Sequence, residues 1–366
     1  MNACDIALPN ISAIKPYQPG KPIDELEREL GISNIIKLAS NENPLGPSEV
    51  VLTAIAQAAK ALTRYPDGNG FVLKAALADY YQLTADQITL GNGSNDVLEL
   101  LARTFVSPAD EVIFSQYAFA VYPLVTQAIG AKAVIAPSRD FGHDLDAMTT
   151  LISDKTKLIF IANPNNPTGT AIAPEQIEAF LQQVPSSVIV VLDEAYVEYT
   201  TQTVNTVEWL ANYPNLVITR TFSKAYGLAA LRIGYSLSSP DIADLLNRIR
   251  QPFNVNSLAL AAATAALSEQ AYIDQTKQVN EAGLKQFEAG FKLLSLSFIP
   301  SKGNFITVNV KRNADAVFQL LLQQGVIVRP IANYGLPHHL RISIGLPTEN
   351  QRCLDALAIA LEQKHD

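Results

Sequence analysis

One lysine of this chain lies in a setting that makes its amine a candidate nucleophile. Lys224 follows the apolar stretch 216–219 and stands between Ser223 and Ala225 in a turn that contains Gly227. Partial burial disfavours the ammonium form of a lysine and lowers its pKa. Such an amine forms an imine with an aldehyde cofactor. Most loop lysines are solvated, so this residue alone does not decide the chemistry.

A glycine-rich turn precedes one predicted helix. Gly91-Asn-Gly-Ser-Asn95 separates a strand over 87–90 from a helix over 96–105. Free backbone N–H groups and the helix dipole both favour an anion at such a place. An ordinary strand–helix turn with a Ser or Asn cap has the same pattern. The turn is therefore a candidate phosphate site that needs support from the rest of the chain.

Helices and strands alternate between about residues 87 and 249, and the strands are continuously apolar. This pattern predicts a parallel sheet covered by helices on both faces. Ligands bind to such sheets at the carboxyl ends of the strands. The turn 91–95, Asn166, Asp193 and Lys224 all stand just past predicted strand ends. We therefore expect them to share one site.

The pattern changes after about residue 256. A long helical stretch to about 294 precedes strands and helices that predict a smaller α+β unit. Residues 1–22, which carry several prolines, predict an irregular arm that joins this unit. We expect a large domain over 45–255 and a small domain formed by 1–44 and 256–366. Two domains suit a chain of 366 residues.

Composition narrows the class of protein. The formal net charge of −8 argues against nucleic-acid binding, because phosphate backbones require a basic surface. Cys4 and Cys353 are the only cysteines, so neither a disulfide framework nor a zinc-type spacing is present. No apolar stretch reaches the ~20 residues of a membrane span. The first residues lack the basic start and apolar run of a signal peptide. We expect a cytoplasmic protein without a metal or membrane partner.

Three motifs together resemble the fold type I aminotransferases that use pyridoxal 5'-phosphate. They are Thr221–Arg232 around the lysine, Asn163–Gly169 and Asp193–Tyr196, in the order found in that family. Leu38–Pro47 and Arg64–Asp67 resemble the histidinol-phosphate aminotransferase branch. The similarity runs from near the start of the chain to its last helix. It implies an α/β fold with a large, mostly parallel sheet flanked by helices and a smaller α+β domain.

The resemblance implies roles around the cofactor ring. Lys224 would hold the cofactor as an imine and later move the substrate proton. Asp193 would pair with the pyridine nitrogen and keep it protonated. Asn166 and Tyr196 would contact the ring hydroxyl, and Tyr117 would stack on the ring face.

The resemblance also implies a phosphate site and a dimer. Ser94, Asn95, Ser223 and Arg232 would bind the cofactor phosphate, for which a guanidinium is well suited. Tyr65 would reach the phosphate of the other subunit, so the protein would be a homodimer with shared active sites.

Arg341, Arg329 and Tyr17 would bind the substrate. The implied reaction is transamination of L-histidinol phosphate with 2-oxoglutarate, which gives imidazole-acetol phosphate and L-glutamate in histidine biosynthesis. An aromatic amino acid aminotransferase, a broad-specificity relative and a decarboxylase of a phosphorylated amino acid remain alternatives. A nucleotide-binding α/β protein is disfavoured, because the chain lacks both Gly-x-Gly-x-x-Gly and a Gly-Lys-Ser/Thr phosphate loop.

Overall fold

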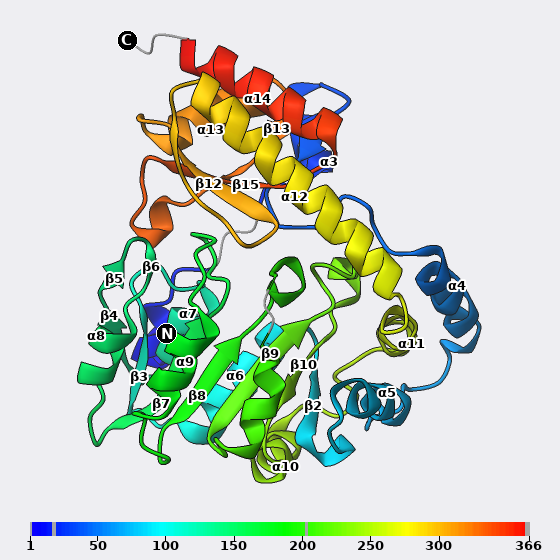
Figure 1. Ribbon diagram of the computed structural model, residues 1–366, viewed down its shortest axis with the longest axis vertical. Helices are drawn as coiled ribbons and strands as arrows, with labels where there is room; N and C mark the ends of the chain where they lie inside the picture. Colours follow the sequence, from blue (N-terminus) through cyan, green and yellow to red (C-terminus); the bar gives the residue numbers. More distant parts are fainter. Residues whose placement is uncertain (1, 17–19, 202–203, 363–366) are drawn as a thin grey trace.

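Two sheets organise the molecule (Figure 1). The computed structural model describes residues 2–16, 20–201 and 204–362. A seven-stranded sheet with the order β2-β10-β9-β8-β7-β3-β4 forms the centre of the large lobe. A four-stranded sheet with the order β11-β12-β15-β14 forms the small lobe. Each of the pairs β1-β13 and β5-β6 forms a two-stranded ladder.

The strands have these bounds: β1 Ile36–Lys37, β2 Ile88–Gly91, β3 Glu111–Ser115, β4 Lys132–Ala136, β5 Ser138–Arg139, β6 Gly142–His143, β7 Thr156–Ala162, β8 Ile189–Asp193, β9 Leu216–Thr221, β10 Gly234–Leu237, β11 Ser297–Ile299, β12 Phe305–Asn309, β13 Val326–Ile327, β14 Arg329–Pro330 and β15 His339–Ser343. The α-helices have these bounds: α1 Ala3–Ile6, α2 Pro9–Ser12, α3 Ile23–Leu30, α4 Glu49–Ala58, α5 Phe71–Tyr81, α6 Ser94–Phe105, α7 Val121–Ile129, α8 Leu145–Thr150, α9 Pro174–Leu181, α10 Pro240–Ile249, α11 Ser257–Ala266, α12 Gln270–Leu293, α13 Ala314–Gln323 and α14 Pro347–Glu362.

The large sheet is parallel except for one strand. Except for the edge strand β4, the strands of this sheet are buried on both faces, and two hydrophobic cores cover the sheet from opposite sides. Strand β10 runs antiparallel to both β2 and β9. The connection from β9 to β10 carries only a 3-10 turn over Ala229–Leu231. The chain thus returns without the crossover helix that a parallel pair requires. The predicted α/β fold class, with a mostly parallel sheet, is confirmed.

Helix α12 runs between the two lobes, as Figure 1 shows in yellow. It packs on α14 and on strands of the small sheet. A third hydrophobic core fills the space between the small sheet and its helices. The helical stretch predicted over 256–294 consists of two helices, α11 and α12. The domain boundaries near residues 45 and 256 stay a prediction.

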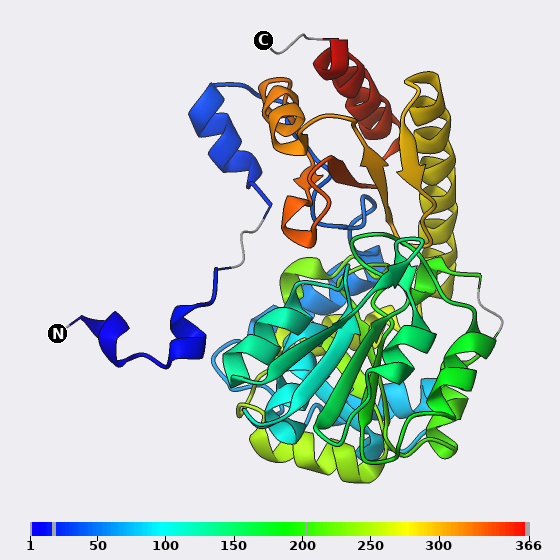
Figure 2. The same cartoon turned by 90° about the vertical axis from the view of Figure 1, so that its left-hand side faces the viewer.

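The N-terminal segment contains two short helices where the sequence predicts an irregular arm. Pro9 opens α2, where a missing N–H group has no cost. Asn10 Nδ2 donates to the carbonyl oxygen of Ala128 at 2.9 Å, so α2 lies on α7 of the large lobe. Figure 2 shows this segment beside the body of the molecule. In contrast, Ile36 of β1 pairs with Val326 of the small lobe.

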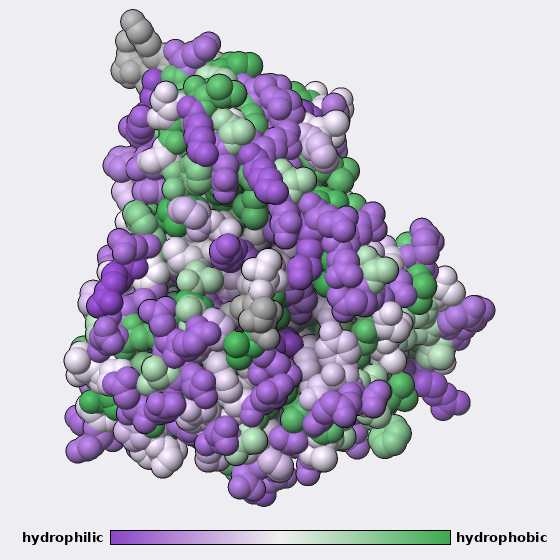
Figure 3. All heavy atoms as spheres, in the orientation of Figure 1, coloured by the Kyte–Doolittle hydropathy of each residue, from purple (hydrophilic) through white to green (hydrophobic). Residues whose placement is uncertain are grey.

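The face of the molecule in Figure 3 is mostly hydrophilic, with apolar residues dispersed between polar ones. None of the helices in the described part of the chain combines the length and the apolar character that a membrane-spanning helix requires.

Candidate active site

A cavity of about 210 Å³ lies at the carboxyl ends of β7, β8 and β9, next to the small sheet. Most of the predicted site residues line it: Ser94, Asn95, Asn166, Asp193, Tyr196, Ser223, Lys224, Arg232, Arg329 and Arg341. They come from both lobes and from strand ends that are distant in sequence. In the described ranges, no group of three or more His, Cys, Asp or Glu residues lies close enough to hold a metal ion.

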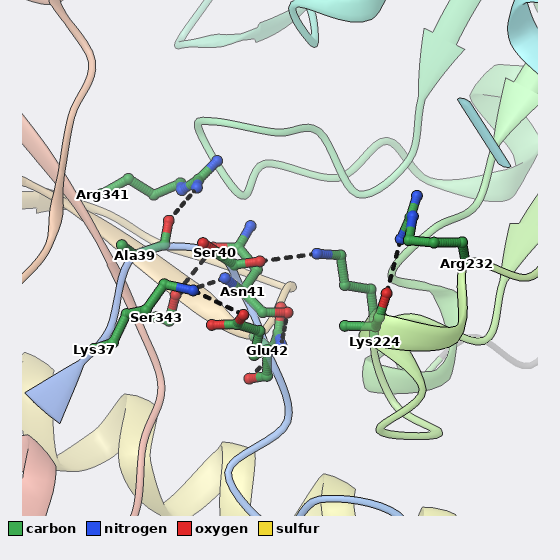
Figure 4. A network of polar contacts seen from close by, with 11 residues as sticks. Lys37, Ala39, Ser40, Asn41, Glu42, Lys224, Arg232, Arg341 and Ser343 are labelled. Carbon is green, nitrogen blue, oxygen red and sulfur yellow. Dashed lines mark hydrogen bonds and ion pairs between the residues drawn. The ribbon is translucent and has the colours of Figure 1, made fainter. Parts of the chain in front are cut away.

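Lys224 projects into this cavity from the turn after β9. Its Nζ donates to the carbonyl oxygen of Ser40 at 3.0 Å (Figure 4). Burial, together with the positive charge of Arg341, lowers the pKa of Lys224 to about 7. A substantial fraction of the amine is therefore unprotonated at neutral pH, as a nucleophile requires.

Asp193 is the last residue of β8 and is only 4% exposed. Tyr122 Oη donates to its Oδ2 at 2.7 Å, whereas its Oδ1 is buried and has no hydrogen-bond partner in the protein. Burial raises the pKa of Asp193, although the bond from Tyr122 opposes this effect. A protonated ring nitrogen at Oδ1 would satisfy the second oxygen and stabilise the carboxylate. The free oxygen of the Asp193 carboxylate therefore fits a pyridinium N–H group.

Tyr196 lies between the two lobes. Asn41 Nδ2 donates to Tyr196 Oη at 2.9 Å, and the Asn41 backbone N–H donates to Ser343 Oγ at 2.7 Å. Burial raises the pKa of Tyr196 to about 12, so its hydroxyl keeps its proton. Because Asn41 already donates to this oxygen, Tyr196 has its own proton available for another acceptor. Asn41 and Ser343 lie together in the network of Figure 4.

The predicted phosphate residues meet at the N-terminus of α6. Ser94 begins this helix, and Arg232 Nη1 donates to Ser223 Oγ at 3.2 Å. A Cβ atom at Gly93 would lie 2.4 Å from Arg232 Nη2, and Gly93 also has a φ of +81°. Only glycine lets the guanidinium lie against this helix end. Backbone N–H groups, a hydroxyl and a guanidinium together fit a phosphate dianion.

Two arginines of the small sheet face the opposite side of the cavity. Arg329 and Arg341 are cross-strand partners on β14 and β15, and both line the cavity. Arg341 Nη1 donates to Asn166 Oδ1 at 2.6 Å, and its Nη2 donates to the carbonyl oxygen of Ala39 at 2.7 Å. Its buried Nε has no hydrogen-bond partner in the protein. This guanidinium therefore retains one donor without an acceptor in the protein.

The structure corrects the predicted start of the helix at Tyr117, whereas the role of Tyr117 on the cofactor ring stays a prediction. Helix α7 begins at Val121, so Tyr117 lies in the turn before it rather than at the start of the helix. Its ring stacks on Phe141 with 5.8 Å between centroids, and it is not among the residues that line the cavity. Phe119, two positions later, lines the cavity instead.

Tyr65 lies outside the cavity of its own chain. It is 82% exposed and stacks on Phe253, with 4.8 Å between ring centroids. The large exposed area agrees with the idea that it serves another subunit, which stays a prediction. Tyr17 lies outside the described residues.

Sequence reasoning missed three residues at this site. Tyr122 reads as an ordinary apolar position of a helix, and Asn41 as part of an Asn-Pro turn. Phe119 stands close to the predicted Tyr117, and only the start of α7 decides which ring enters the cavity. A left-handed backbone at Asn41, with φ of 55°, is common for asparagine but gives no indication of its partner.

The family description Aminotransferase class I and II matches residues 33–357. The chain belongs to this aminotransferase family, and the sequence-based assignment is confirmed. Within the family it is similar to the histidinol-phosphate aminotransferases. It is 59% identical over 360 residues to histidinol-phosphate aminotransferase 2 of Pseudomonas fluorescens, and the alignment covers 97% of both chains. It is also 58% identical over 356 residues to histidinol-phosphate aminotransferase 1 of Mannheimia succiniciproducens, again over 97% of both.

Solved structures agree with these relatives. Histidinol-phosphate aminotransferase of Sinorhizobium meliloti, in complex with pyridoxal-5'-phosphate, superposes with a TM-score of 0.90. The two chains are 30% identical, and the match covers 97% of each. The enzyme from Clostridium acetobutylicum has a TM-score of 0.83 at 25% identity, over 89% of this chain and 99% of that one.

Proposed function

We propose that this chain catalyses amino transfer between L-histidinol phosphate and 2-oxoglutarate, with pyridoxal 5'-phosphate as cofactor, in histidine biosynthesis. The products are imidazole-acetol phosphate and L-glutamate. The observation that carries the proposal is the cavity in which Lys224 and Asp193 face a common space beside two arginines. The substrate follows from the similarity over nearly the whole length to the Pseudomonas fluorescens enzyme.

The residues present fit the cofactor at each of its ends. We propose that Lys224 holds its aldehyde, that Asp193 pairs with its ring nitrogen, and that Asn166 and Tyr196 contact its hydroxyl group. When bound, pyridoxal phosphate supplies an electron sink for the bonding pair of the substrate carbon that carries the amino group. We propose Phe119, in place of Tyr117, as the aromatic residue on the ring face.

The cofactor phosphate would bind at the start of α6. Ser94 and Asn95 offer backbone N–H groups, Ser223 a hydroxyl and Arg232 a guanidinium, all of them on the cavity wall. Such charge-assisted contacts would hold the phosphate firmly and leave the aldehyde of the cofactor to the lysine.

Lys224 would carry the proton of the reaction. Its Nζ would take the proton from the substrate carbon that bears the amino group and return it at the cofactor end, as a general base and then a general acid. A pKa of about 7 suits both steps at neutral pH, because neither protonation state dominates. The Ser40 carbonyl would hold the free amine while this proton moves.

The two small-lobe arginines would bind the substrate anion. Arg341 and Arg329 lie side by side on neighbouring strands. Their guanidinium groups can bind either a phosphate monoester or a carboxylate, so one pocket would serve both histidinol phosphate and 2-oxoglutarate. Tyr17 stays a predicted substrate contact. We also propose a homodimer in which Tyr65 completes the neighbouring site, and a cytoplasmic location.

The test is a comparison of kcat/KM for L-histidinol phosphate and for phenylalanine, each with 2-oxoglutarate. The proposal expects a ratio above about 100 in favour of histidinol phosphate, because a site built for a charged group loses several kcal/mol when that group is missing. Equal values would instead support the aromatic alternative. Release of carbon dioxide without need for an oxo-acid would support the decarboxylase.

A further inference from the structure

A buried ion pair lies directly behind the candidate active site. Arg220 Nε and Nη2 donate to Glu194 Oε2 at 2.9 and 2.6 Å. Thr206 Oγ1 donates to Glu194 Oε1 at 2.7 Å, so both carboxylate oxygens have partners. The Glu194 side chain is 1% exposed and that of Arg220 11%. A charged pair in such surroundings is stable only in a geometry that satisfies both groups.

The pair joins the two strands that carry the cofactor residues. Glu194 immediately follows Asp193 at the end of β8, and its backbone N–H donates to the carbonyl oxygen of Thr219 at 2.8 Å. Arg220 lies on β9, whose end leads into the turn of Lys224. Because β8 and β9 are parallel neighbours, the ion pair spans the same end of the sheet as Asp193 and Lys224.

Arg220 is itself held from the other side. Its Nη1 donates to Tyr81 Oη at 2.9 Å, and its guanidinium lies over the Tyr81 ring at 5.0 Å from the centroid. Tyr81 Oη and Tyr235 Oη are 2.6 Å apart. Glu194, which follows β8, and Tyr81 of α5 therefore leave the guanidinium little freedom, and Tyr235 of β10 holds the Tyr81 hydroxyl in turn. Neither Glu194 nor Arg220 lines the cavity, so the pair has no direct contact with a ligand there.

We propose that the Glu194–Arg220 ion pair positions the active site by fixing the distance between the Asp193 carboxylate and the Lys224 amine. The pair acts on the reaction through those two residues. Without it, the end of β8 shifts relative to the lysine turn, and the Asp193 carboxylate holds the protonated ring nitrogen less well. The inference rests on the proposed cofactor site, but it does not depend on which amino compound is the substrate.

The test compares Glu194→Gln with a matched control at the other end of the same sheet. Glu111 and Lys132 pair across β3 and β4 at 2.9 Å, and the Glu111 residue is 8% exposed. Glu111→Gln therefore breaks a strand-to-strand ion pair far from the cavity. Each variant is loaded with pyridoxal phosphate, and three quantities are measured: the pH at which the absorbance of the lysine-bound cofactor changes, kcat and KM, and the urea midpoint of unfolding.

In Glu194→Gln the displaced Asp193 holds the proton of the ring nitrogen less well. A ring nitrogen without its proton no longer repels the proton on Lys224 Nζ, so we expect the pH midpoint of the absorbance change to rise by about one unit. We expect kcat to fall about tenfold or more while KM changes less than about threefold. Glu111→Gln should lower the urea midpoint and leave the absorbance midpoint and kcat unchanged.

A second variant covers the case in which Glu194→Gln does not fold. Arg220→Lys keeps the charge but loses the two contacts to one carboxylate oxygen, and it carries the same expectations with a smaller amplitude. A folded variant with an unchanged absorbance midpoint and kcat would overturn the inference. If the wild-type protein binds pyridoxal phosphate but does not convert histidinol phosphate, the proposed substrate fails, and the absorbance test still decides the role of the ion pair.

Discussion

Replacing Lys224 with methionine is expected to stabilise the cofactor-free protein. Lys224 is largely buried, and its pKa falls from 10.5 to about 7. For full burial this shift of ~3.5 units corresponds to ~5 kcal/mol of unfavourable free energy while the amine is charged. Its remaining solvent contact reduces this value, and the lost hydrogen bond to Ser40 subtracts ~1 kcal/mol. We expect Lys224→Met to raise the free energy of unfolding by ~2–3 kcal/mol near neutral pH.

The pH dependence of this gain has a definite sign. Below about pH 7 both folded and unfolded chains hold the Lys224 proton, so the penalty is fully present. Between about pH 7 and 10.5 the unfolded chain binds more protons than the folded one. The wild-type protein therefore gains stability by up to ~1.4 kcal/mol per pH unit relative to the variant. The advantage of methionine shrinks toward the alkaline limit.

Urea unfolding of both cofactor-free proteins at several pH values is the assay. Lys132→Met is a suitable control, because Lys132 is an exposed lysine, with 71% of its side chain accessible, and it is paired with Glu111. We expect Lys132→Met not to stabilise the fold at any of these pH values. A Lys224→Met protein that is less stable than wild type near neutral pH, or an advantage that is constant with pH, would refute the reasoning.

Three further predictions follow from the site. Tyr122→Phe removes a hydrogen bond to a buried carboxylate worth ~1.5–3 kcal/mol, so the affinity for pyridoxal phosphate should fall about tenfold or more in a fluorescence titration; an unchanged affinity would contradict this role. Phe119→Ala should weaken cofactor binding in the same titration by more than Tyr117→Ala does, and the reverse order would restore Tyr117 as the stacking residue. When inactive Tyr65→Ala and Lys224→Ala proteins are mixed in equal amounts and refolded, about half of the dimers are hybrids with one intact site each, so the mixture should regain about a quarter of the wild-type activity, whereas unshared sites would regain none.

The sequence alone predicted that several polar site residues lie together at the carboxyl ends of the strands. Parallel strands place their carboxyl ends at one edge of the sheet. Because Asn166, Asp193 and Lys224 each follow a predicted strand, they are expected to lie close together. The glycine-rich turn predicted a candidate anion site at Ser94, and the family resemblance placed Arg232 beside it. Each of these residues lies on the cavity wall. Their proposed roles rest on the family resemblance and stay predictions.

Orientations that depend on tertiary packing were not predictable. Periodicity places a helix near residues 117–129, but the four residues before Val121 form a turn, and this decides that Phe119 rather than Tyr117 enters the cavity. Tyr122 acquires its importance only because the fold places its hydroxyl on the carboxylate of Asp193 at the end of β8. The same holds for Asn41, whose partners Tyr196 and Ser343 come from different lobes. No local pattern contains such information.

The reversed strand β10 has a consequence for how the site tolerates change. Ser223, Lys224 and Arg232 all belong to the single connection between β9 and β10 or to its edge. Their mutual spacing is thus set by the short segment between two antiparallel strands, whereas the small-lobe arginines lie roughly a hundred residues later in the chain. If the small-lobe arginines bind the substrate as proposed, we expect mutations in the small lobe to change the substrate preference more readily than the affinity for the cofactor.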